Sequence, residues 1–514
     1  AYVWSAVKKN RLLREQLMGL LRPHLPQTVL PVVRVFNTLG HRRSGPAAVY
    51  IDHQLLPADR EFILTDEGGA EVGLQEISTR EEGTWWMAGV QDIPPLGYRT
   101  YTIHTTEKSR GRAEGHRFSG RLENNFYRIV IDTVSGKIAS IFDKEWNREL
   151  VDAASPYTIG EFIYERLGKN RGQMEQKQFD EFTRVSWSGI TVGPVTGGPL
   201  WESVTLAGSV PECASEPGIL CEIRLFRNEK RVEFRWSMRK KAVTDPEAVY
   251  IAFPFHLEGG RQVFQVAGGT IRPWREQVEG SATDWTGIQD FAALRNREGQ
   301  IVLCSPEIPL VQPGAINTGK FYRTPNPGRH AGPTEGWPAT GAIFSWVLNN
   351  YWTTNFLASQ EGEMKWSYAI TSGPDTANAF AAKFGAEVRI PMPFRVSPGT
   401  AGHQETLIPR AFLPQLPAGI QLVSVRPAGD RRILLQLRET NGCSDSLTVY
   451  DLLSSSVTLA DITGAGEVTE TNVLLEPTGP AWSRNGSRPA ALQAVRLRFK
   501  PFEVKFILIT PAKP

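Results

Sequence analysis

The chain has 514 residues, a length that predicts about three domains at about 150 residues each. Its 57 Lys and Arg nearly balance its 54 Asp and Glu, and no basic tract stands out, so we expect no nucleic-acid partner. The 41% of hydrophobic residues is typical of a globular chain, and no apolar run approaches the roughly 18 residues of a membrane helix. Four cysteines exclude a disulfide scaffold, although Cys213 and Cys221 are near enough in sequence to pair.

The first residues predict a helix and contain no signal peptide. Residue 1 is Ala, and no charged segment followed by an apolar core comes after it, so we expect a soluble fragment or processed product and assign no compartment. Apolar residues between Trp4 and Leu21 recur near helical spacing, and Pro23 and Pro26 end the pattern. Such a stripe must be buried, either on the β-structure that follows or on a part of a longer protein.

After Thr28 the apolar pattern changes to the period of two that is typical of strands. The clearest example is a hairpin at 219–239. We expect it to bury one set of side chains, Val232, Phe234, Trp236 and Met238, and to expose another, Arg231, Glu233 and Arg235. A second hairpin is predicted at 126–142, a strand at 364–370 and a strand pair at 496–509. The 47 Gly and 36 Pro fit many turns, so the predicted class is mainly β, in several sandwiches.

Breaks in this pattern suggest domain limits. A polar, glycine-containing stretch at 107–117 resembles a linker, and 398–417 is weakly patterned. They leave β-domains at 28–106, 118–397 and 405–514, after an N-terminal helical segment at 1–27. The middle domain is too large for an ordinary sandwich and suggests two large stacked sheets. Within it, 306–341 reads as a long loop, either functional or a surface excursion.

Motifs for catalysis are scarce. The eight histidines are scattered and form no HxH, HxD or HExxH pattern, and CxxC, GxSxG and GxGxxG are missing from the sequence. We therefore expect no cofactor or metal in this chain. Two carboxylate pairs, Glu161 with Glu165 and Glu276 with Asp284, are candidates for the paired carboxylates of a glycosidase. With 54 acidic residues such pairs also arise by chance, as solvated or salt-bridged carboxylates.

Aromatic residues beside polar groups are more suggestive. There are 14 tryptophans, and Trp274 and Trp352 both have polar neighbours. Sugars stack their C–H faces on such rings while nearby polar groups bind the hydroxyls; the alternative is that the rings fill wide sandwich cores. The run 349–355 (NNYWTTN) fits no simple strand, because its amides need hydrogen-bond partners if they are buried.

That run and several others, in the same order, resemble the β-region of bacterial α-mannosidases of glycoside hydrolase family 38. The similar segments are 35–39 (VFNTL) with 43–45 (RSG), 92–98 (DIPPLGY), 122–128 (LENNFYR), 135–138 (SGKI), 141–144 (IFDK), 284–291 (DWTGIQDF), 309–311 (PLV) and 344–356 (FSWVLNNYWTTNF). They span most of residues 30–370, whereas 405–514 is similar only in general character.

The resemblance implies a galactose mutarotase-like super-sandwich for the large β-domain. It also implies that the helix at 1–27 is the last helix of a bundle behind a separate α/β catalytic domain. In the family, the zinc ligands, the nucleophile and the acid/base carboxylate lie in that missing domain, so no catalytic residue or cofactor is carried over to this chain. The implied partners are that N-terminal catalytic domain and, through the parent enzyme, an α-mannoside-type glycan. The fragment alone is expected to be inactive.

The resemblance also implies that the β-region contributes an arginine and aromatic residues near the substrate. The candidates for the arginine are Arg272 and Arg275, on either side of Trp274, because a guanidinium is a rigid fork suited to vicinal hydroxyls; the alternative is an ordinary surface or salt-bridged arginine. Asn350, Tyr351 and Trp352 are either substrate-proximal as well or structural, fastening one sheet edge.

Two other functions stay open at this point. One is a stand-alone carbohydrate-binding protein built from β-sandwiches. The other is a mutarotase-like epimerase, for which His256 and Glu258 on one strand face are the only candidates; the alternative is an ordinary histidine at a strand end. Fold analogy alone does not decide between them.

Overall fold

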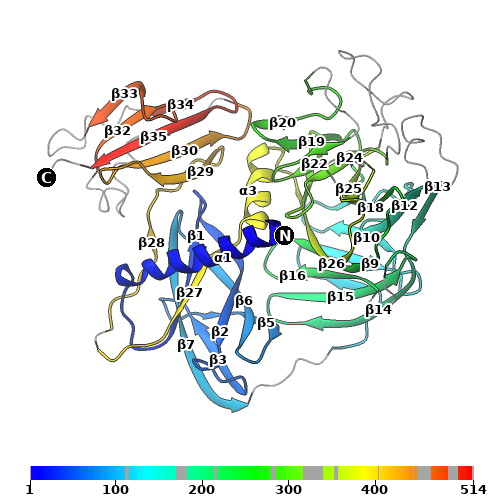
Figure 1. The fold of residues 1–514 in the computed structure, drawn as a ribbon, viewed down its shortest axis with the longest axis horizontal. Coiled ribbons are helices and arrows are strands. Elements are labelled where there is room, and N and C mark those ends of the chain that lie inside the picture. The colour runs from blue at the N-terminus through cyan, green and yellow to red at the C-terminus, as the bar shows by residue number, and fades with distance from the viewer. Residues whose placement is uncertain are drawn as a thin grey trace. The chain divides into compact units, whose positions relative to one another are not determined.

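The computed structural model describes residues 2–511 except 110–114, 169–181, 214–215, 217, 279–284, 317–339, 352–356, 403, 444, 449–464 and 484–495. The chain forms two compact units, the first made of Ala1–Arg112 with Pro391–Pro514 and the second of Ala113–Ile390. Strands dominate both units (Figure 1), so the predicted mainly-β class with an N-terminal helix is confirmed. The limits proposed for the individual domains remain predictions.

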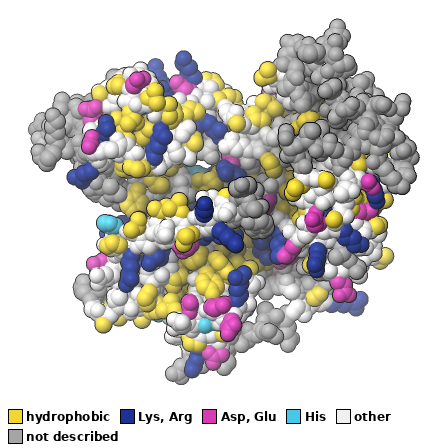
Figure 2. Space-filling view, in the orientation of Figure 1, with side chains coloured by type: hydrophobic (Ala, Val, Ile, Leu, Met, Phe, Trp, Pro, Cys, Tyr) yellow, Lys and Arg dark blue, Asp and Glu magenta, His cyan; other side chains and the backbone are white. Residues whose placement is uncertain are grey.

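The first unit begins with helix α1 (Tyr2–Leu20) and a single 3-10 turn, η1 (Arg22–His24). Met18 of α1 is buried against Phe36 and Tyr98 of the following sandwich. The leucine face of α1, which we define as Leu13, Leu17 and Leu20, is 52–70% exposed. These residues recur at i, i+4 and i+7 and so share one side of the helix. Figure 2 shows hydrophobic side chains gathered along this helix and over the strands beside it.

Two sheets form the sandwich that follows α1. The first has the order β27-β1-β7-β3-β4, with β28 paired to β7. Its strands are β1 (Val32–Asn37), β3 (Arg60–Thr65), β4 (Glu71–Val72), β7 (Gly97–Ser109), β27 (Phe394–Ser397) and β28 (Arg410–Ala411). The second has the order β2-β6-β5, with β2 (Arg43–Asp52), β5 (Leu74–Thr79) and β6 (Gly83–Ile93). Alternate side chains from the two sheets, such as Val33, Val49 and Trp86, share one core. Strand β7 extends to Ser109, so the predicted linker at 107–117 begins inside a strand.

A separate core holds the C-terminal strands. One sheet has the order β29-β30-β35-β32-β33, and a two-stranded sheet joins β31 to β34. The strands are β29 (Ile420–Pro427), β30 (Ile433–Glu439), β31 (Asp445–Thr448), β32 (Ala465–Thr471), β33 (Pro477–Ser483), β34 (Arg496–Phe499) and β35 (Val504–Pro511). The two strands predicted at 496–509 are present as β34 and β35, but they do not pair with each other, because they lie in different sheets. The turn between them is bound to β30, with Phe502 N donating to Glu439 Oε2 at 2.8 Å, and this directs β35 alongside β30.

Three sheets build the second unit. A four-stranded sheet, β11-β10-β9-β8, consists of β8 (Arg121–Glu123), β9 (Tyr127–Ile131), β10 (Ile138–Asp143) and β11 (Arg148–Glu149). A six-stranded sheet, β13-β12-β18-β25-β24-β21, consists of β12 (Glu161–Leu167), β13 (Phe182–Ser186), β18 (Glu247–Pro254), β21 (Thr286–Gly287), β24 (Leu310–Pro313) and β25 (Ala342–Asn349). A nine-stranded sheet, β14-β15-β16-β17-β26-β23-β22-β19-β20, consists of β14 (Ser188–Gly197), β15 (Trp201–Ser209), β16 (Ile219–Phe226), β17 (Val232–Lys240), β19 (Arg261–Val266), β20 (Gly269–Ile271), β22 (Ala292–Arg295), β23 (Gln300–Cys304) and β26 (Gly362–Gly373).

The main core of this unit lies between the six- and nine-stranded sheets. It joins Phe162 and Phe253 of the smaller sheet to Phe234 and Tyr368 of the larger one. The predicted hairpin at 126–142 is confirmed as the β9–β10 pair. Cys213 and Cys221 are buried free thiols, so they do not form the disulfide that their spacing allows.

The hairpin predicted at 219–239 is confirmed as β16 and β17, but one of its faces was misjudged. Residues 232, 234, 236 and 238 are at most 2% exposed, and Arg235 is exposed as expected. Glu233, however, is buried, and the Arg231 side chain is only 12% exposed. The two form an ion pair, and the Arg231 guanidinium also lies 4.9 Å from the centre of the Phe226 ring. Alternation predicts which face a residue occupies, but not whether that face reaches solvent.

Two elements of the second unit escaped the sequence pattern. Helix α3 (Asn378–Arg389) packs its small residues Ala381 and Ala382 on Phe291, which precedes β22, and on Val302 of β23. A Cβ at Gly385 of this helix would lie 2.3 Å from the backbone oxygen of Asp290, so the close approach requires glycine. Strand β24 lies inside the predicted loop at 306–341, of which 317–339 are outside the described residues.

Candidate functional site

The loop after β20 carries three of the predicted site residues. Arg272 is exposed and is held by Glu276, with Nε donating to Oε1 at 2.6 Å and the backbone N donating to Oε2 at 2.8 Å. Burial by itself would raise the pKa of Glu276, but the hydrogen bonds and charge of Arg272 outweigh it and lower that pKa. The pairing of Glu276 with Asp284 receives no support here, since Asp284 lies outside the described residues.

Trp274 occupies the centre of this loop in an unusual backbone conformation. Its φ of 68° lies in the left-handed region, which is a true outlier for a bulky aromatic residue. Its backbone N donates to Gln277 Oε1 at 2.8 Å, which helps to hold the turn. Trp274 is partly exposed and Arg275 is exposed. Strain of this kind often accompanies a functional constraint, so the loop is an accessible candidate for contact with a ligand.

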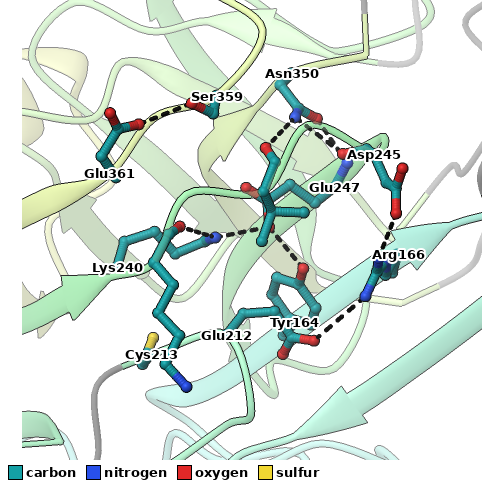
Figure 3. Close-up of polar contacts among 12 residues, drawn as sticks. Tyr164, Arg166, Glu212, Cys213, Lys240, Asp245, Glu247, Asn350, Ser359 and Glu361 are labelled. Carbon is teal, nitrogen blue, oxygen red and sulfur yellow. Dashed lines mark hydrogen bonds and ion pairs between the residues drawn. The ribbon is translucent and has the colours of Figure 1, made fainter.

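Asn350, by contrast, is a buried clamp at the end of β25 (Figure 3). Its Nδ2 group donates to the carbonyl oxygens of Val243, Asp245 and Ala358 at 2.9–3.1 Å. Its Oδ1 accepts from the backbone N of Glu247 at 2.7 Å. The reverse orientation of the amide would set its oxygen against three carbonyl oxygens. Asn350 therefore fastens the start of β18 and the chain before β26 to the end of β25.

A buried ionic network adjoins this clamp (Figure 3). Lys240 Nζ lies 2.8 Å from Glu247 Oε2, and both side chains are 0% exposed. Tyr164 donates its hydroxyl proton to the same oxygen at 2.6 Å. Burial raises the pKa of Glu247 above its ordinary value, while the hydrogen bonds from Lys240 and Tyr164 partly offset this effect. Sequence reasoning missed this network, because a lysine and a glutamate at strand ends give no periodic signal.

Tyr351 lies in a second buried cluster, on the other face of the six-stranded sheet from the main core. Its hydroxyl donates to Glu165 Oε1 at 3.3 Å and lies 3.3 Å from the Tyr250 hydroxyl. Arg184 pairs with Glu165 at 2.8 Å, and the Trp346 ring packs 5.6 Å from the Tyr351 ring. Burial raises the pKa of Tyr351 well above its ordinary value. The side chain is thus a neutral, interior hydrogen-bond donor.

The predicted site residues therefore fall into two groups on different sheets. Arg272, Trp274 and Arg275 follow the edge strand of the nine-stranded sheet and reach the surface. Asn350 and Tyr351 are 4% and 2% exposed at the end of a strand of the six-stranded sheet. Of the two alternatives for Asn350 and Tyr351, their contacts favour the structural one. Trp352 lies outside the described residues.

The other candidate carboxylates lack the geometry of a glycosidase pair. Glu161 and Glu165 are both on β12, and four residues of strand separate them by about 13 Å. Retaining and inverting glycosidases place their two carboxyl groups about 5 Å and about 6.5–9.5 Å apart. Glu161 instead accepts from the backbone N of Thr158 at 2.7 Å and from Ser186. The two carboxylates are anchors of local structure.

His256 and Glu258 lie just past the end of β18 and are both exposed. The backbone N of His256 donates to Leu150 O at 2.9 Å, as expected for a residue that continues a strand end. Across the described ranges, no three His, Cys, Asp or Glu side chains come together in a group that could hold a metal ion. In the same residues, no helix is both long and apolar enough to cross a membrane.

Comparison with known proteins agrees with the resemblance to glycoside hydrolase family 38. Residues 122–304 match the family model "Glycosyl hydrolases family 38 C-terminal domain", which confirms the resemblance of this region. An α-mannosidase structure from Enterococcus faecalis V583 is similar at a TM-score of 0.64 and 13% identity, covering 94% of this chain and 57% of that one. A protein of glycosyl hydrolase family 38 from Enterococcus faecalis is similar at a TM-score of 0.62 and 12% identity, covering 94% and 59%.

A galactose mutarotase-like protein from Lactobacillus casei ATCC 334 also matches, at a TM-score of 0.28 and 11% identity, covering 49% of this chain and 99% of that one. A search of curated protein sequences finds no match for the chain. At these identities the two Enterococcus structures establish the fold. The chain spans 57–59% of their length.

Proposed function

We propose that this chain is the non-catalytic β-region of an α-mannosidase-like glycoside hydrolase, and that it supports a separate catalytic domain. The observation that carries the proposal is the asymmetric coverage: 94% of this chain aligns with 57% of the α-mannosidase structure. The family match at 122–304 adds support from sequence, because it falls on a C-terminal domain of family 38. Under this proposal the zinc ion and the catalytic carboxylates belong to the remainder of the parent enzyme.

The leucine face of α1 supports a docking role. Leu13, Leu17 and Leu20 are 52%, 52% and 70% exposed, although aliphatic side chains on one side of a helix usually find a partner. Full burial of an exposed leucine contributes about 1.5–3 kcal/mol, so covering the part of each side chain that is still exposed contributes about 1–2 kcal/mol. We infer that the catalytic part of the parent enzyme covers this face.

The loop after β20 is our candidate for contact with the substrate. Arg275 is exposed, and Arg272 is exposed but oriented by Glu276, so the loop presents a guanidinium in a fixed position. Trp274 sits between the two arginines and is partly exposed. A guanidinium fork beside an aromatic ring suits a pyranose, which offers vicinal hydroxyls and an apolar C–H face. Asn350 and Tyr351 then act by holding the sheet and not by touching sugar.

One experiment tests the proposal in three parts. The chain by itself should release no nitrophenol from 4-nitrophenyl α-mannoside and should contain no stoichiometric zinc, because hydrolysis needs a converging acid and nucleophile. The reading frame that encodes the chain should contain an α/β domain with an HxD motif. That domain, produced separately, should bind the chain, and Leu13→Ser/Leu17→Ser should weaken the complex while Val134→Ser does not. Val134 is a matched control, since it is 86% exposed and lies in the other unit. Turnover by the pure chain would overturn the proposal.

A further inference from the structure

A groove of about 760 Å³ lies in the first unit between α1 and the neighbouring sandwich. Its volume is within the range of ligand-binding clefts. Arg11, Arg14 and Glu15 of α1 form one wall. The opposite wall comes from β2, β6 and β27, through Tyr50, Trp85, Phe394 and neighbouring residues. None of the residues predicted from sequence to contact sugar belongs to this groove.

Strand alternation explains the aromatic floor of the groove. Tyr50 of β2 is paired directly with Trp85 of β6, and the next pair, Val49 with Trp86, points into the sandwich core. The first pair must therefore point outward. The Tyr50 and Trp85 rings are 5.2 Å apart, and Phe394 packs edge-on against Trp85 at 5.9 Å. All three rings remain partly exposed, so they form a continuous platform beneath the groove.

Polar groups with unused hydrogen-bonding capacity surround this platform. The Arg395 side chain makes no hydrogen bond or ion pair with any described residue, and its Nε is buried without an acceptor. Its cross-strand partner in β1 is Arg34, so the register places a second cation beside it and no carboxylate. Asp52 and Gln54 are exposed at the rim. Asp52 Oδ1 accepts from the Gln54 backbone N at 2.7 Å, and both residues line the groove.

The aromatic platform and the polar side chains around it together disfavour a purely apolar ligand. A hydrophobic helix laid over the platform would supply no acceptor of its own to the Arg395 charge that it covers, which is costly. A hydroxyl-rich ligand with one apolar face would satisfy both the rings and the guanidinium. We propose that the groove binds a pyranose ring of a neutral oligosaccharide, stacked on Trp85 and Tyr50, with its hydroxyls bound by Arg395, Asp52 and Gln54. The residues of this groove belong to the first unit, whereas the loop after β20 belongs to the second. The inference rests on the proposed function only for the choice of α-linked mannotriose as a probe.

Calorimetric titration of the full chain with α-linked mannotriose and with maltotriose tests this inference, with saturation-transfer NMR for weak binding. We expect mannotriose to bind and Trp85→Leu to weaken it at least about tenfold, or about 1.4 kcal/mol. Arg395→Gln should weaken binding without loss of folding, because the side chain makes no described bond. Arg80→Gln is the matched control, since Arg80 is exposed and does not line the groove. Near-UV circular dichroism checks that each variant is folded.

The outcomes separate this inference from the proposed function. Binding of maltotriose alone, weakened by Trp85→Leu and Arg395→Gln, would support the groove as a sugar site and argue against an α-mannoside parent. If neither sugar binds, or if both variants leave the affinity unchanged, the inference is overturned. Binding of a leucine-rich amphipathic peptide in place of both sugars would also overturn it, and would identify the groove as a protein-docking surface.

Discussion

Asn350 offers the sharpest test of whether the most recognisable run of the sequence is structural or binds sugar. Its side chain makes four described hydrogen bonds, all to backbone groups of segments far away in the sequence or across a turn. A neutral hydrogen bond contributes about 1 kcal/mol, so the four bonds together contribute about 3–5 kcal/mol. Asn350→Ala should therefore lower the free energy of unfolding of the second unit by about 3–5 kcal/mol.

Asn350→Asp sharpens the test because it changes almost no volume. The Oδ1 acceptor for Glu247 N is kept, but the Nδ2 donor becomes an oxygen that faces the carbonyls of Val243, Asp245 and Ala358. Repulsion in a buried site should make this variant at least as unstable as Asn350→Ala. Asn349→Ala is the control, since Asn349 is the adjacent amide, is partly exposed and keeps its backbone pairing with Ala248.

Urea unfolding followed by near-UV circular dichroism measures these changes, alongside the affinity for mannotriose. The expected pattern is a large loss of stability for both Asn350 variants, with affinity unchanged under conditions where the protein stays folded. A loss of stability below about 1 kcal/mol, well under the sum of the lost bonds, would refute the clamp. A selective loss of sugar affinity in a stable Asn350 variant would return this residue to the binding site.

Three further predictions follow from burial and charge. Trp236→Ala should destabilise the second unit by about 3–5 kcal/mol, since its ring is 2% exposed and stacks on Trp366 at 6.0 Å; a change under about 1 kcal/mol in urea unfolding would contradict this. Burial by itself would raise the pKa of Glu233, but nearby arginines, with Arg231 the strongest, lower it below 4.5, so its contribution to stability is present above about pH 4.5 and lost as pH falls through the folded pKa. Glu233→Gln should flatten the fall in melting temperature below pH 4.5, and an unchanged acid slope would show that other groups cause it. Leu13→Ser/Leu17→Ser should lower the stability of the isolated chain by only about 1 kcal/mol, because both leucines are 52% exposed and the exchange costs mainly helix propensity; a loss above about 2 kcal/mol in thermal unfolding would mean that the face is already covered.

The sequence predicted the parts of the fold that depend on local pattern. Period-two alternation located the β16–β17 hairpin and its buried set correctly, and proline spacing located the end of α1. The local pattern failed where another element packs over a strand or helix face that the pattern alone would place in solvent. Ala381 and Ala382 of α3 are small residues that allow the helix to pack close to the sheet. Because they are small, the helix has only a weak apolar stripe in its sequence. Which strands pair across distant segments, as β34 does with β31, also depends on contacts that no local pattern records.

The candidate site was less predictable, for a related reason. The amides of 349–355 indicated that buried partners were needed, and Asn350 has them, but the sequence did not say whether those partners were backbone or sugar. The sequence suggests Glu276 and Asp284 as a carboxylate pair, whereas Glu276 forms an ion pair with Arg272, four residues away in the same turn. The Tyr50–Trp85 platform arises from two residues 35 positions apart, and only the register of β2 on β6 brings them together. A site built from cross-strand neighbours is invisible until that register is known.

Four buried acids of the second unit are held in ion pairs, which gives them a structural role. Asp143, Glu165 and Asp290 have fully buried side chains, each bound to a cation from another element at 2.6–2.9 Å. Glu247 has the same arrangement with Lys240 at 2.8 Å. Removing one partner of such a pair costs about 3–5 kcal/mol, because the other charge stays buried. These carboxylates are bound to fixed cations away from solvent, so they join strands and helices of the second unit.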